Sequence, residues 1–261
     1  MNADAPRADV AQAINVDPAV REALRGLRRQ TESVPRRTAL PDLAERVRQV
    51  GADEDLVRRF EQAATAAGAH VHLVSQTDQN PGRQAGARLP AGGIGPRADA
   101  KRCAWIAKVR ELLQARGAKT ALLATARPDS ALNSERRQEL VMFLAADGIA
   151  EQSTPDDETL FSVDAAITDV SAAIAETGTI VCVSGPGLAR GASLIPPVHI
   201  AVVAAQQILP DLYDYLEQIG ADADLPASHM LISGPSKTAD IEGVLVTGMH
   251  GPGELHVIVL M

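Results

Sequence analysis

The chain has 261 residues, of which 46% are hydrophobic, 22% charged and 2% aromatic, a composition typical of a globular protein with an aliphatic core. Its formal charge of −8 disfavours nucleic acid as the main partner, because phosphate groups bind to basic surfaces. No apolar run approaches the ~18 residues of a membrane span, and the amino-terminal residues lack the apolar stretch of a signal peptide. We therefore expect a cytoplasmic protein with no membrane span.

The chain contains two cysteines, Cys103 and Cys182, which lie far apart in the sequence. This count argues against a disulfide framework and agrees with a reducing compartment. Cys182 lies in an apolar strand pattern and Cys103 lies near Trp105 in a helical one, so we expect both to pack in the interior. An iron–sulfur cluster usually requires about four cysteine ligands, which predicts that this chain alone binds none.

The first part of the chain is predicted to contain an arm, a helix, a strand and a long loop. Residues 1–40 are rich in Ala, Arg and Asp, with a helical pattern followed by proline breaks, and we interpret them as a partly helical N-terminal arm. An α/β domain is predicted over 41–261. It begins with apolar residues at helical spacing and a strand at Ala69–Val74, followed by a glycine-rich loop at 76–97. A loop of that length is usually functional or disordered.

Strand and helix patterns alternate through the rest of the chain. Helices are predicted at 100–116, at 134–146, in a short stretch ending at Glu176 and at 209–219, and strands at 118–124, 160–163, 165–168, 179–183, 199–204 and at the carboxyl end. This alternation predicts the α/β fold class, with a mostly parallel sheet and helices on both of its faces.

Two short turns of the same form interrupt this pattern. Ser-Gly-Pro follows an apolar run at Ser184 and again at Ser233, where a helix that begins with hydroxyls and acids is predicted to follow. In an open parallel sheet, the carboxyl ends of the strands lie along one edge and form the ligand crevice. We therefore expect both turns, with Gly185 and Gly234, at that edge.

The charges of the carboxyl-terminal half are strongly asymmetric. Residues 151–261 contain 15 acidic side chains but only two basic ones, Arg190 and Lys237. Each of the two follows a Ser-Gly-Pro turn, where a cation is well placed to receive an anionic ligand group. The alternative, that each cation pairs with a neighbouring acid, stays open.

A first group of candidate site residues surrounds Glu176. A carboxylate there could act as a base, a nucleophile or an acceptor for a hydroxyl group. Gly178 permits a tight turn, and Thr177 and Thr179 could satisfy freed backbone groups or a ligand. A glycine-capped helix end explains the same residues without any function.

Two histidines are further candidates. His199 opens a strongly apolar strand after a Pro-Pro pair, so it either serves a ligand or is a core histidine bonded to the backbone. His250 lies in a Gly-Pro turn, which makes it a better catalytic or ligand-binding candidate than His256, although turn histidines are often only solvated. A metal site of His199, His250 and Glu176 is disfavoured, because no two of the six histidines stand four residues apart.

A third group of candidates follows Ser233. Ser236 and Thr238 offer hydroxyls around the predicted helix start, and Asp240 complements its dipole. The Ser-Lys-Thr triplet lacks the glycine spacing of a phosphate-binding loop, which argues against nucleotide hydrolysis. No Gly-x-Gly-x-x-Gly fingerprint supports NAD binding.

Taken together, five motifs in this order resemble the LUD domain, and in particular the lactate utilisation protein C family. The motifs are Ala-Ile-Ala-Glu-Thr-Gly-Thr (173–179), Ser-Gly-Pro-Gly (184–187), Leu-Ile-Pro-Pro-Val-His-Ile (194–200), Ser-Gly-Pro-Ser-Lys-Thr-Ala-Asp-Ile-Glu (233–242) and His-Gly-Pro (250–252). They cover about the last ninety residues tightly, whereas the predicted arm and the glycine-rich loop match none of them.

The resemblance implies a fold similar to the glucosamine-phosphate deaminase, ribose-phosphate isomerase and CoA-transferase group. It also implies membership of a three-component cytoplasmic system that oxidises L-lactate to pyruvate, in which the iron–sulfur clusters belong to the two partner subunits. Chemically, Arg190 or Lys237 would pair with the lactate carboxylate, and His250 or Glu176 would accept the hydroxyl proton. The candidate substrate-binding residues are Thr177, Gly178, Thr179, Ser184, Gly185, Arg190, His199, Ser233, Gly234, Ser236, Lys237, Thr238 and Asp240.

Three functions are compatible with these residues. The first is a subunit of the lactate-oxidising system that binds the substrate or stabilises the complex. The second is a stand-alone enzyme that acts on a sugar phosphate, a CoA ester or a folate and needs no partner. The third is a structural adaptor that docks through residues 1–40.

Overall fold

The computed structural model describes residues 50–51, 55–75, 104–125, 131–152, 156–185, 188–220, 226–239 and 245–261. All of them belong to the unit Arg48–Met261. The predicted arm at 1–40, the predicted loop at 76–97 and Cys103 lie outside the described residues and stay predictions. Within the described ranges, no helix combines the length and the apolar character needed to cross a membrane.

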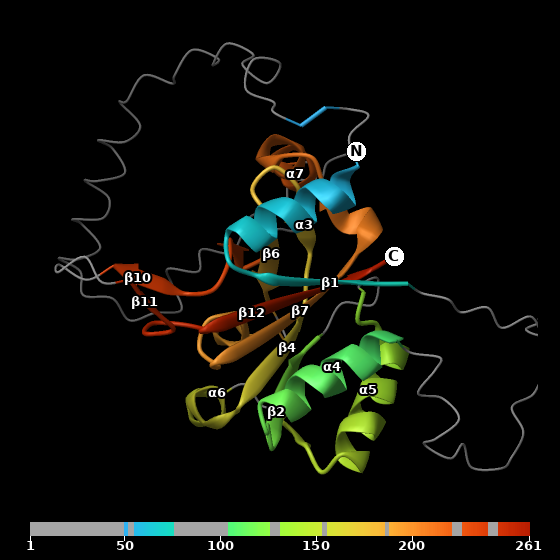
Figure 1. The fold of residues 1–261 in the computed structure, drawn as a ribbon, viewed down its shortest axis with the longest axis vertical. Helices are drawn as coiled ribbons and strands as arrows, with labels where there is room; N and C mark the ends of the chain where they lie inside the picture. Colours follow the sequence, from blue (N-terminus) through green and yellow to red (C-terminus); the bar gives the residue numbers. More distant parts are fainter. Residues whose placement is uncertain are drawn as a thin grey trace, which may run out of the picture. The chain divides into compact units, whose positions relative to one another are not determined.

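A parallel six-stranded sheet forms the centre of the fold (Figure 1). Its strand order is β1 (His70–Val74), β12 (Glu254–Leu260), β7 (Val198–Ala204), β4 (Ala165–Asp169), β2 (Thr120–Ala124) and β3 (Ala150–Gln152), and every neighbouring pair runs parallel. The central strands β7 and β12 are nearly continuous apolar runs, as expected for strands that are buried on both faces. The predicted α/β class with a mostly parallel sheet is confirmed.

Helices cover both faces of this sheet. The helical elements are α3 (Leu56–Ala66), α4 (Ala104–Ala115), α5 (Ser134–Ala146), α6 (Asp157–Ser162) and α7 (Leu212–Gly220), with short 3₁₀ turns η2 (Arg190–Ser193) and η3 (Ala205–Gln207). Side chains alternate along β7, so Ile200 packs in a core with α4 and α5, whereas Ala201 packs on the other face with α3. Figure 1 shows α3 on one side of the sheet and α4 and α5 on the other.

A second, mixed sheet lies against the same face as α3. Its order is β8 (Ile208–Leu209), β5 (Ala172–Ile174), β6 (Thr179–Ser184) and β9 (Ser228–Ile232), and a separate hairpin joins β10 (Lys237–Ala239) to β11 (Leu245–Thr247). Ala173, Ile180 and Cys182 of this sheet pack with Ala201 of β7, so the predicted burial of Cys182 is confirmed. The sequence pattern did not predict this second layer.

The expected placement of the two Ser-Gly-Pro turns on one edge of the parallel sheet is wrong. The strands that precede them, β6 and β9, are antiparallel neighbours in the second sheet, with Ser184 opposite Ser228 and Ile180 opposite Ile232. The carboxyl ends of antiparallel strands point in opposite directions. The two turns therefore leave the strand pair at opposite ends.

Three predicted elements also differ from the structure. Residues 160–163 were expected to form a strand, but Leu160 lies in α6, where Asp156 caps the helix by accepting from the Thr159 amide. The short helix ending at Glu176 is instead strand β5 followed by a tight turn, in which Gly178 has a φ of +63°. The helix expected after Ser236 is the β10–β11 hairpin. All three are short segments, in which hydrophobic spacing is too brief to distinguish helix from strand.

Asp164 ties the amino ends of β2 and β4 together. Its Oδ2 accepts from the Lys119 amide at 2.7 Å and from the amide and hydroxyl of Thr120, both at 2.9 Å. We expect Asp164→Ala to lower the free energy of unfolding by about 1–3 kcal/mol, because these donors lose their acceptor. Urea denaturation followed by circular dichroism measures the loss. Asp157→Ala, at an exposed carboxylate, is the control, and equal losses in the two variants would contradict the prediction.

Candidate functional site

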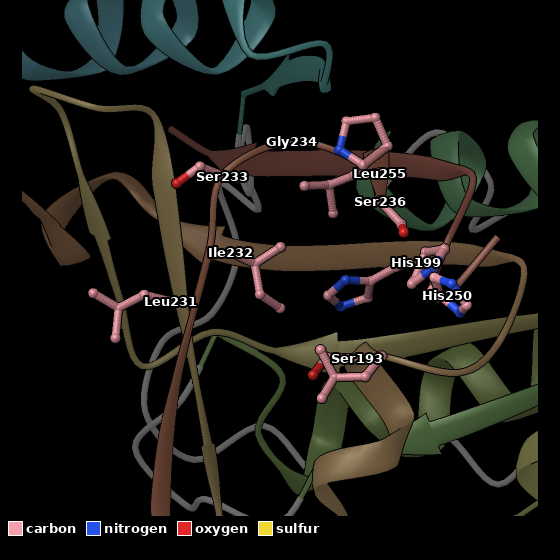
Figure 2. Close-up of a pocket in the computed structure, with 13 residues that line it drawn as sticks. Ser193, His199, Leu231, Ile232, Ser233, Gly234, Ser236, His250 and Leu255 are labelled. Atoms are coloured by element: carbon pink, nitrogen blue, oxygen red, sulfur yellow. The ribbon is translucent and has the colours of Figure 1, made fainter. Parts of the chain in front are cut away.

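A pocket of about 280 Å³ opens at the amino ends of β7 and β12, and we call it the His199 pocket (Figure 2). It is lined by Ser193, Leu194, His199, Leu231, Ile232, Ser233, Gly234, Pro235, Ser236, His250, Gly251, Pro252 and Leu255. His199 and Leu255 are the second residues of their strands, so the pocket lies at the amino edge of the parallel sheet. The crevice predicted at the carboxyl edge does not correspond to this pocket.

Three segments line the pocket, residues 193–199, 231–236 and 250–255. Backbone hydrogen bonds join them. The Ser236 amide donates to the Pro252 carbonyl at 2.8 Å, and the Gly253 amide donates to the Pro197 carbonyl at 2.9 Å. Gly251 lies so close to its neighbours that a Cβ there would meet the Leu194 carbonyl oxygen at 3.2 Å. Because these bonds are made within the protein, the walls of the pocket are already assembled without a ligand.

His199 is the most deeply buried polar residue of the pocket. Its side chain is fully buried, and its Nε2 lies 2.7 Å from the Thr168 hydroxyl oxygen. Its Nδ1 is buried and has no hydrogen-bond partner among the described residues. Burial lowers the pKa of His199 to about 4, because desolvation disfavours the charged ring. The imidazole is therefore neutral at physiological pH, and one of its two ring nitrogens is unpaired among the described residues.

Figure 2 shows the imidazole of His199 among the labelled lining residues, with Ile232 and Ser193 nearby and the ring of His250 beyond it. His250 itself is exposed, as expected for a turn histidine. The pocket thus has one buried and one exposed imidazole, together with the hydroxyls of Ser193, Ser233 and Ser236.

Polar groups behind His199 extend the site into the interior. The Cys182 sulfur lies 3.9 Å from the Thr168 hydroxyl, and burial raises the pKa of the Cys182 thiol to about 12. The cysteine is therefore a neutral thiol and not a nucleophilic thiolate. Ser193, which is also buried, lines the pocket from the end of η2. The sequence reasoning did not select Thr168, Cys182 or Ser193 as site residues.

A chain of hydroxyl groups connects the turn after β5 to the pocket. The Thr177 and Thr179 hydroxyl oxygens lie 2.6 Å apart, and that of Thr179 lies 2.7 Å from the hydroxyl oxygen of Ser233. Glu176 is not among the lining residues, and its backbone amide donates to the Pro210 carbonyl at 3.0 Å. The first motif therefore reaches the pocket through its threonines and not through its carboxylate.

Three other motif residues contact the carboxyl end of α3. A Cβ at Gly178 would lie 2.1 Å from the Ala64 nitrogen, and one at Gly234 would lie 2.3 Å from the Ala67 carbonyl oxygen. Lys237 Nζ donates to that same carbonyl at 2.6 Å, where a cation complements the helix dipole. These contacts give Gly178, Gly234 and Lys237 a structural role in docking α3.

The remaining candidates lie away from the pocket lining. The Ser184 hydroxyl pairs with that of Ser228 at 2.7 Å, Gly185 pairs with Leu188, and Arg190 is exposed at the start of η2. Thr238 lies opposite Val246 in the hairpin, and Asp240 lies outside the described residues. Of the predicted site residues, the pocket brings together His199, Ser233, Gly234, Ser236 and His250.

No lysine or arginine occurs among the thirteen lining residues, so neither Arg190 nor Lys237 lies where a bound anion would meet it directly. Across the part of the chain that the structure describes, no three His, Cys, Asp or Glu side chains converge as metal ligands would. His199 and His250 line the same pocket, but Glu176 does not join them. What the pocket offers to a ligand is hydrogen bonding from hydroxyls, imidazoles and turn backbone beside apolar side chains.

Comparisons with known proteins identify several relatives of this chain. The chain is 31% identical over 164 residues to an uncharacterized protein of Neisseria meningitidis serogroup B, and the alignment covers 60% of this chain and 67% of that protein. It is 42% identical over 98 residues to lactate utilization protein C of Deinococcus radiodurans, covering 37% of this chain and 46% of that protein. It is 40% identical over 83 residues to lactate utilization protein C of Bacillus subtilis, and this alignment covers 30% of this chain and 35% of that protein. The chain thus spans less than half the length of these two lactate utilization proteins.

Among solved structures, a DUF162 family protein from Deinococcus radiodurans aligns with a TM-score of 0.47 at 21% identity, covering 79% of this chain and 96% of that one. The sequence model of the LUD domain matches residues 57–260, which is well over half of the chain and contains all three segments that line the His199 pocket. The chain therefore belongs to the LUD domain family.

Proposed function

We propose that this protein serves in lactate utilisation, as a subunit of a cytoplasmic system that oxidises L-lactate to pyruvate, and that the His199 pocket binds the small hydroxy acid. The observation that carries the proposal is that the pocket is built from three of the segments by which the chain resembles lactate utilisation protein C. Several relatives with that name are about two-fifths identical to the chain where they align.

The size and lining of the pocket support a small, partly apolar ligand. Its volume of about 280 Å³ lies at the lower end of ligand pockets, which suits a small acid better than a CoA ester or a folate. Leu231, Ile232 and Leu255 could receive a methyl group, while Ser233 and Ser236 could donate to a carboxylate. His250, exposed at the pocket, is the proposed base that finally receives the hydroxyl proton when the hydroxy acid is oxidised.

Electron transfer in this proposal belongs to partner subunits. The two cysteines of the chain are too few to hold an iron–sulfur cluster, which usually requires about four. In the proposed system the clusters belong to partner subunits, and this chain supplies binding and orientation of the substrate.

Calorimetric titration of the purified chain with L-lactate tests the proposed binding. We expect Ser236→Ala and His250→Ala each to weaken binding about tenfold, because each removes a hydrogen-bonding group from the pocket. Arg190→Ala is the informative control. Since Arg190 lies outside the lining, we expect this variant to keep the affinity of the unmodified chain within about twofold. A complete loss of binding in Arg190→Ala would instead support the cation pairing predicted from the charge pattern.

Affinity purification of the tagged chain from lactate-grown cells tests the subunit role. We expect iron–sulfur proteins to co-purify, and metal, flavin and subunit analysis of the captured material identifies them. Recovery of such partners without any lactate binding would leave the chain as a structural subunit. If the chain neither captures a partner nor binds lactate, the proposal is wrong.

A further inference from the structure

His199, a lining residue of the pocket, has a buried ring nitrogen with no hydrogen-bond partner among the described residues. The ring is fully buried, Nε2 is engaged with Thr168 at 2.7 Å, and Nδ1 has no partner within the part of the chain that the structure describes. Buried polar atoms are nearly always hydrogen-bonded, so an unpaired ring nitrogen in a pocket residue is suited to take its partner from a bound molecule. A group bound in the pocket is the natural partner for Nδ1.

The character of this nitrogen restricts the chemistry of that group. Burial keeps the ring neutral, with its pKa lowered to about 4, so a single proton is shared between the two ring nitrogens. Nδ1 is then either an acceptor, which suits a hydroxyl group, or a donor, which suits a carbonyl oxygen. It does not select its ligand by charge.

Thr168 can support both arrangements. When Nε2 carries the ring proton, it donates to the Thr168 oxygen, and the threonine hydroxyl can turn its proton toward the Cys182 sulfur at 3.9 Å. When Nδ1 carries the ring proton, the Thr168 hydroxyl donates to Nε2 instead. The two forms differ in where one proton lies, and neither leaves Nε2 unpaired or adds charge to the interior.

We propose that His199 contacts the reacting oxygen of the ligand through Nδ1, and that Thr168 is the positioning residue that lets this one ring bind either a hydroxyl or a carbonyl group. The pocket then accepts the reduced and the oxidised member of a hydroxy acid and keto acid pair. This inference rests on the proposed function for the identity of the pair, L-lactate and pyruvate. The contact itself requires only a small ligand that carries a hydroxyl or a carbonyl.

Nitrogen-15 NMR of the full chain with labelled histidine tests the proposal. The two ring nitrogens of a neutral histidine have different chemical shifts according to which one is protonated, and His199→Gln identifies the signals of His199. We expect L-lactate to favour protonation at Nε2 and pyruvate to favour protonation at Nδ1. A role of His199 in packing alone would leave both signals unchanged by either ligand.

Variants of Thr168 separate positioning from packing. Thr168→Val keeps the shape of the side chain but removes its hydroxyl. We expect this variant to change the His199 nitrogen signals of the free protein and to weaken the binding of L-lactate and of pyruvate about tenfold. Thr168→Ser keeps the hydroxyl and should restore the original signals and affinities. If the valine variant fails to fold, the ligand-dependent His199 signals of the unmodified chain still test the contact. Thr247→Val, at an exposed strand position in β11, is the matched control.

The outcomes distinguish this inference from the proposed function. If L-lactate or pyruvate binds while the His199 signals stay fixed, the contact through Nδ1 is wrong and the proposed function stands. If neither binds but glycolate or glyoxylate moves the signals, the contact stands and the lactate assignment is wrong. If none of the four compounds moves the signals, or if Thr168→Val leaves them unchanged, the inference is overturned.

Discussion

Gly178→Ala is expected to lower the free energy of unfolding by about 4 kcal/mol or more, which places it among the rare, severely destabilising substitutions. The added Cβ would lie 2.1 Å from the Ala64 nitrogen and 2.5 Å from the Ala63 carbonyl carbon. These are backbone atoms of α3, which cannot yield as a flexible side chain would. To relieve the overlap, α3 would have to separate from the turn after β5, and the buried Phe60 and Ala64 would lose their packing.

The chain contains a matched control for this prediction. Gly117, after α4, has a φ of +62°, nearly the same as the +63° of Gly178, but a Cβ there meets nothing within 4 Å. Gly117→Ala therefore introduces only the strain of a left-handed conformation, which costs about 1–2 kcal/mol. The difference between the two variants, measured by urea denaturation, isolates the overlap with α3. Equal losses would mean that α3 is not packed against Gly178 as the structure shows.

The prediction also bears on how the first motif is interpreted. Gly178 was a candidate for ligand binding from the sequence, because glycine permits a close approach of backbone to a ligand. In the structure the close approach is to α3, and the neighbouring Thr179 hydroxyl contacts Ser233 of the pocket. A motif glycine thus holds the scaffold while the residue beside it reaches the site.

The long, regular elements could be predicted from the sequence because their signals are local. Helix α5 spans 134–146 as predicted, with Asn133 capping it by accepting from the Arg136 amide. Strands β7 and β12 are mostly apolar runs, as expected for strands of a sheet that is covered on both faces. The predicted fold group of sugar-phosphate and CoA enzymes stays a prediction.

The second sheet could not be predicted, because its pairing depends on contacts that are distant in sequence. An apolar run such as 179–183 indicates a buried strand but not its neighbour or its direction. Ser184 meets Ser228 across β6 and β9, and that register, which decides where the Ser-Gly-Pro turns lie, has no local signal. The same limit applies to Thr168, whose importance becomes visible only when β4 and β7 bring it beside His199.

The stability of the protein should fall as the pH decreases from about 6.5 to 4, and His199 should account for roughly 3 kcal/mol of that fall. An unfolded histidine titrates near 6.5, whereas burial lowers the pKa of folded His199 to about 4. The unfolded state therefore binds more protons in this range, so the full contribution is present above pH 6.5 and is lost as the pH falls toward 4.

A second histidine should add to this acid sensitivity. Burial, with a smaller contribution from nearby His70, Arg116 and Lys108, lowers the pKa of His256 to about 4. Its Nδ1 lies 3.3 Å from His72 Nε2, where two protonated rings would repel each other. Acid should therefore weaken the pairing of the edge strand β1 with β12 as well as the interior around His199.

Chemical denaturation at a series of pH values separates the two contributions. His199→Gln and His256→Gln should each flatten the dependence of unfolding free energy on pH between 4 and 6.5, whatever their effect on stability at pH 7. His250→Gln, at an exposed ring in a turn, is the control for loss of a histidine as such. If the slope in His199→Gln matches that of the unmodified chain, the ring of His199 is not held neutral by burial. The neutral ring that the proposed contact with a hydroxyl or a carbonyl requires would then be absent.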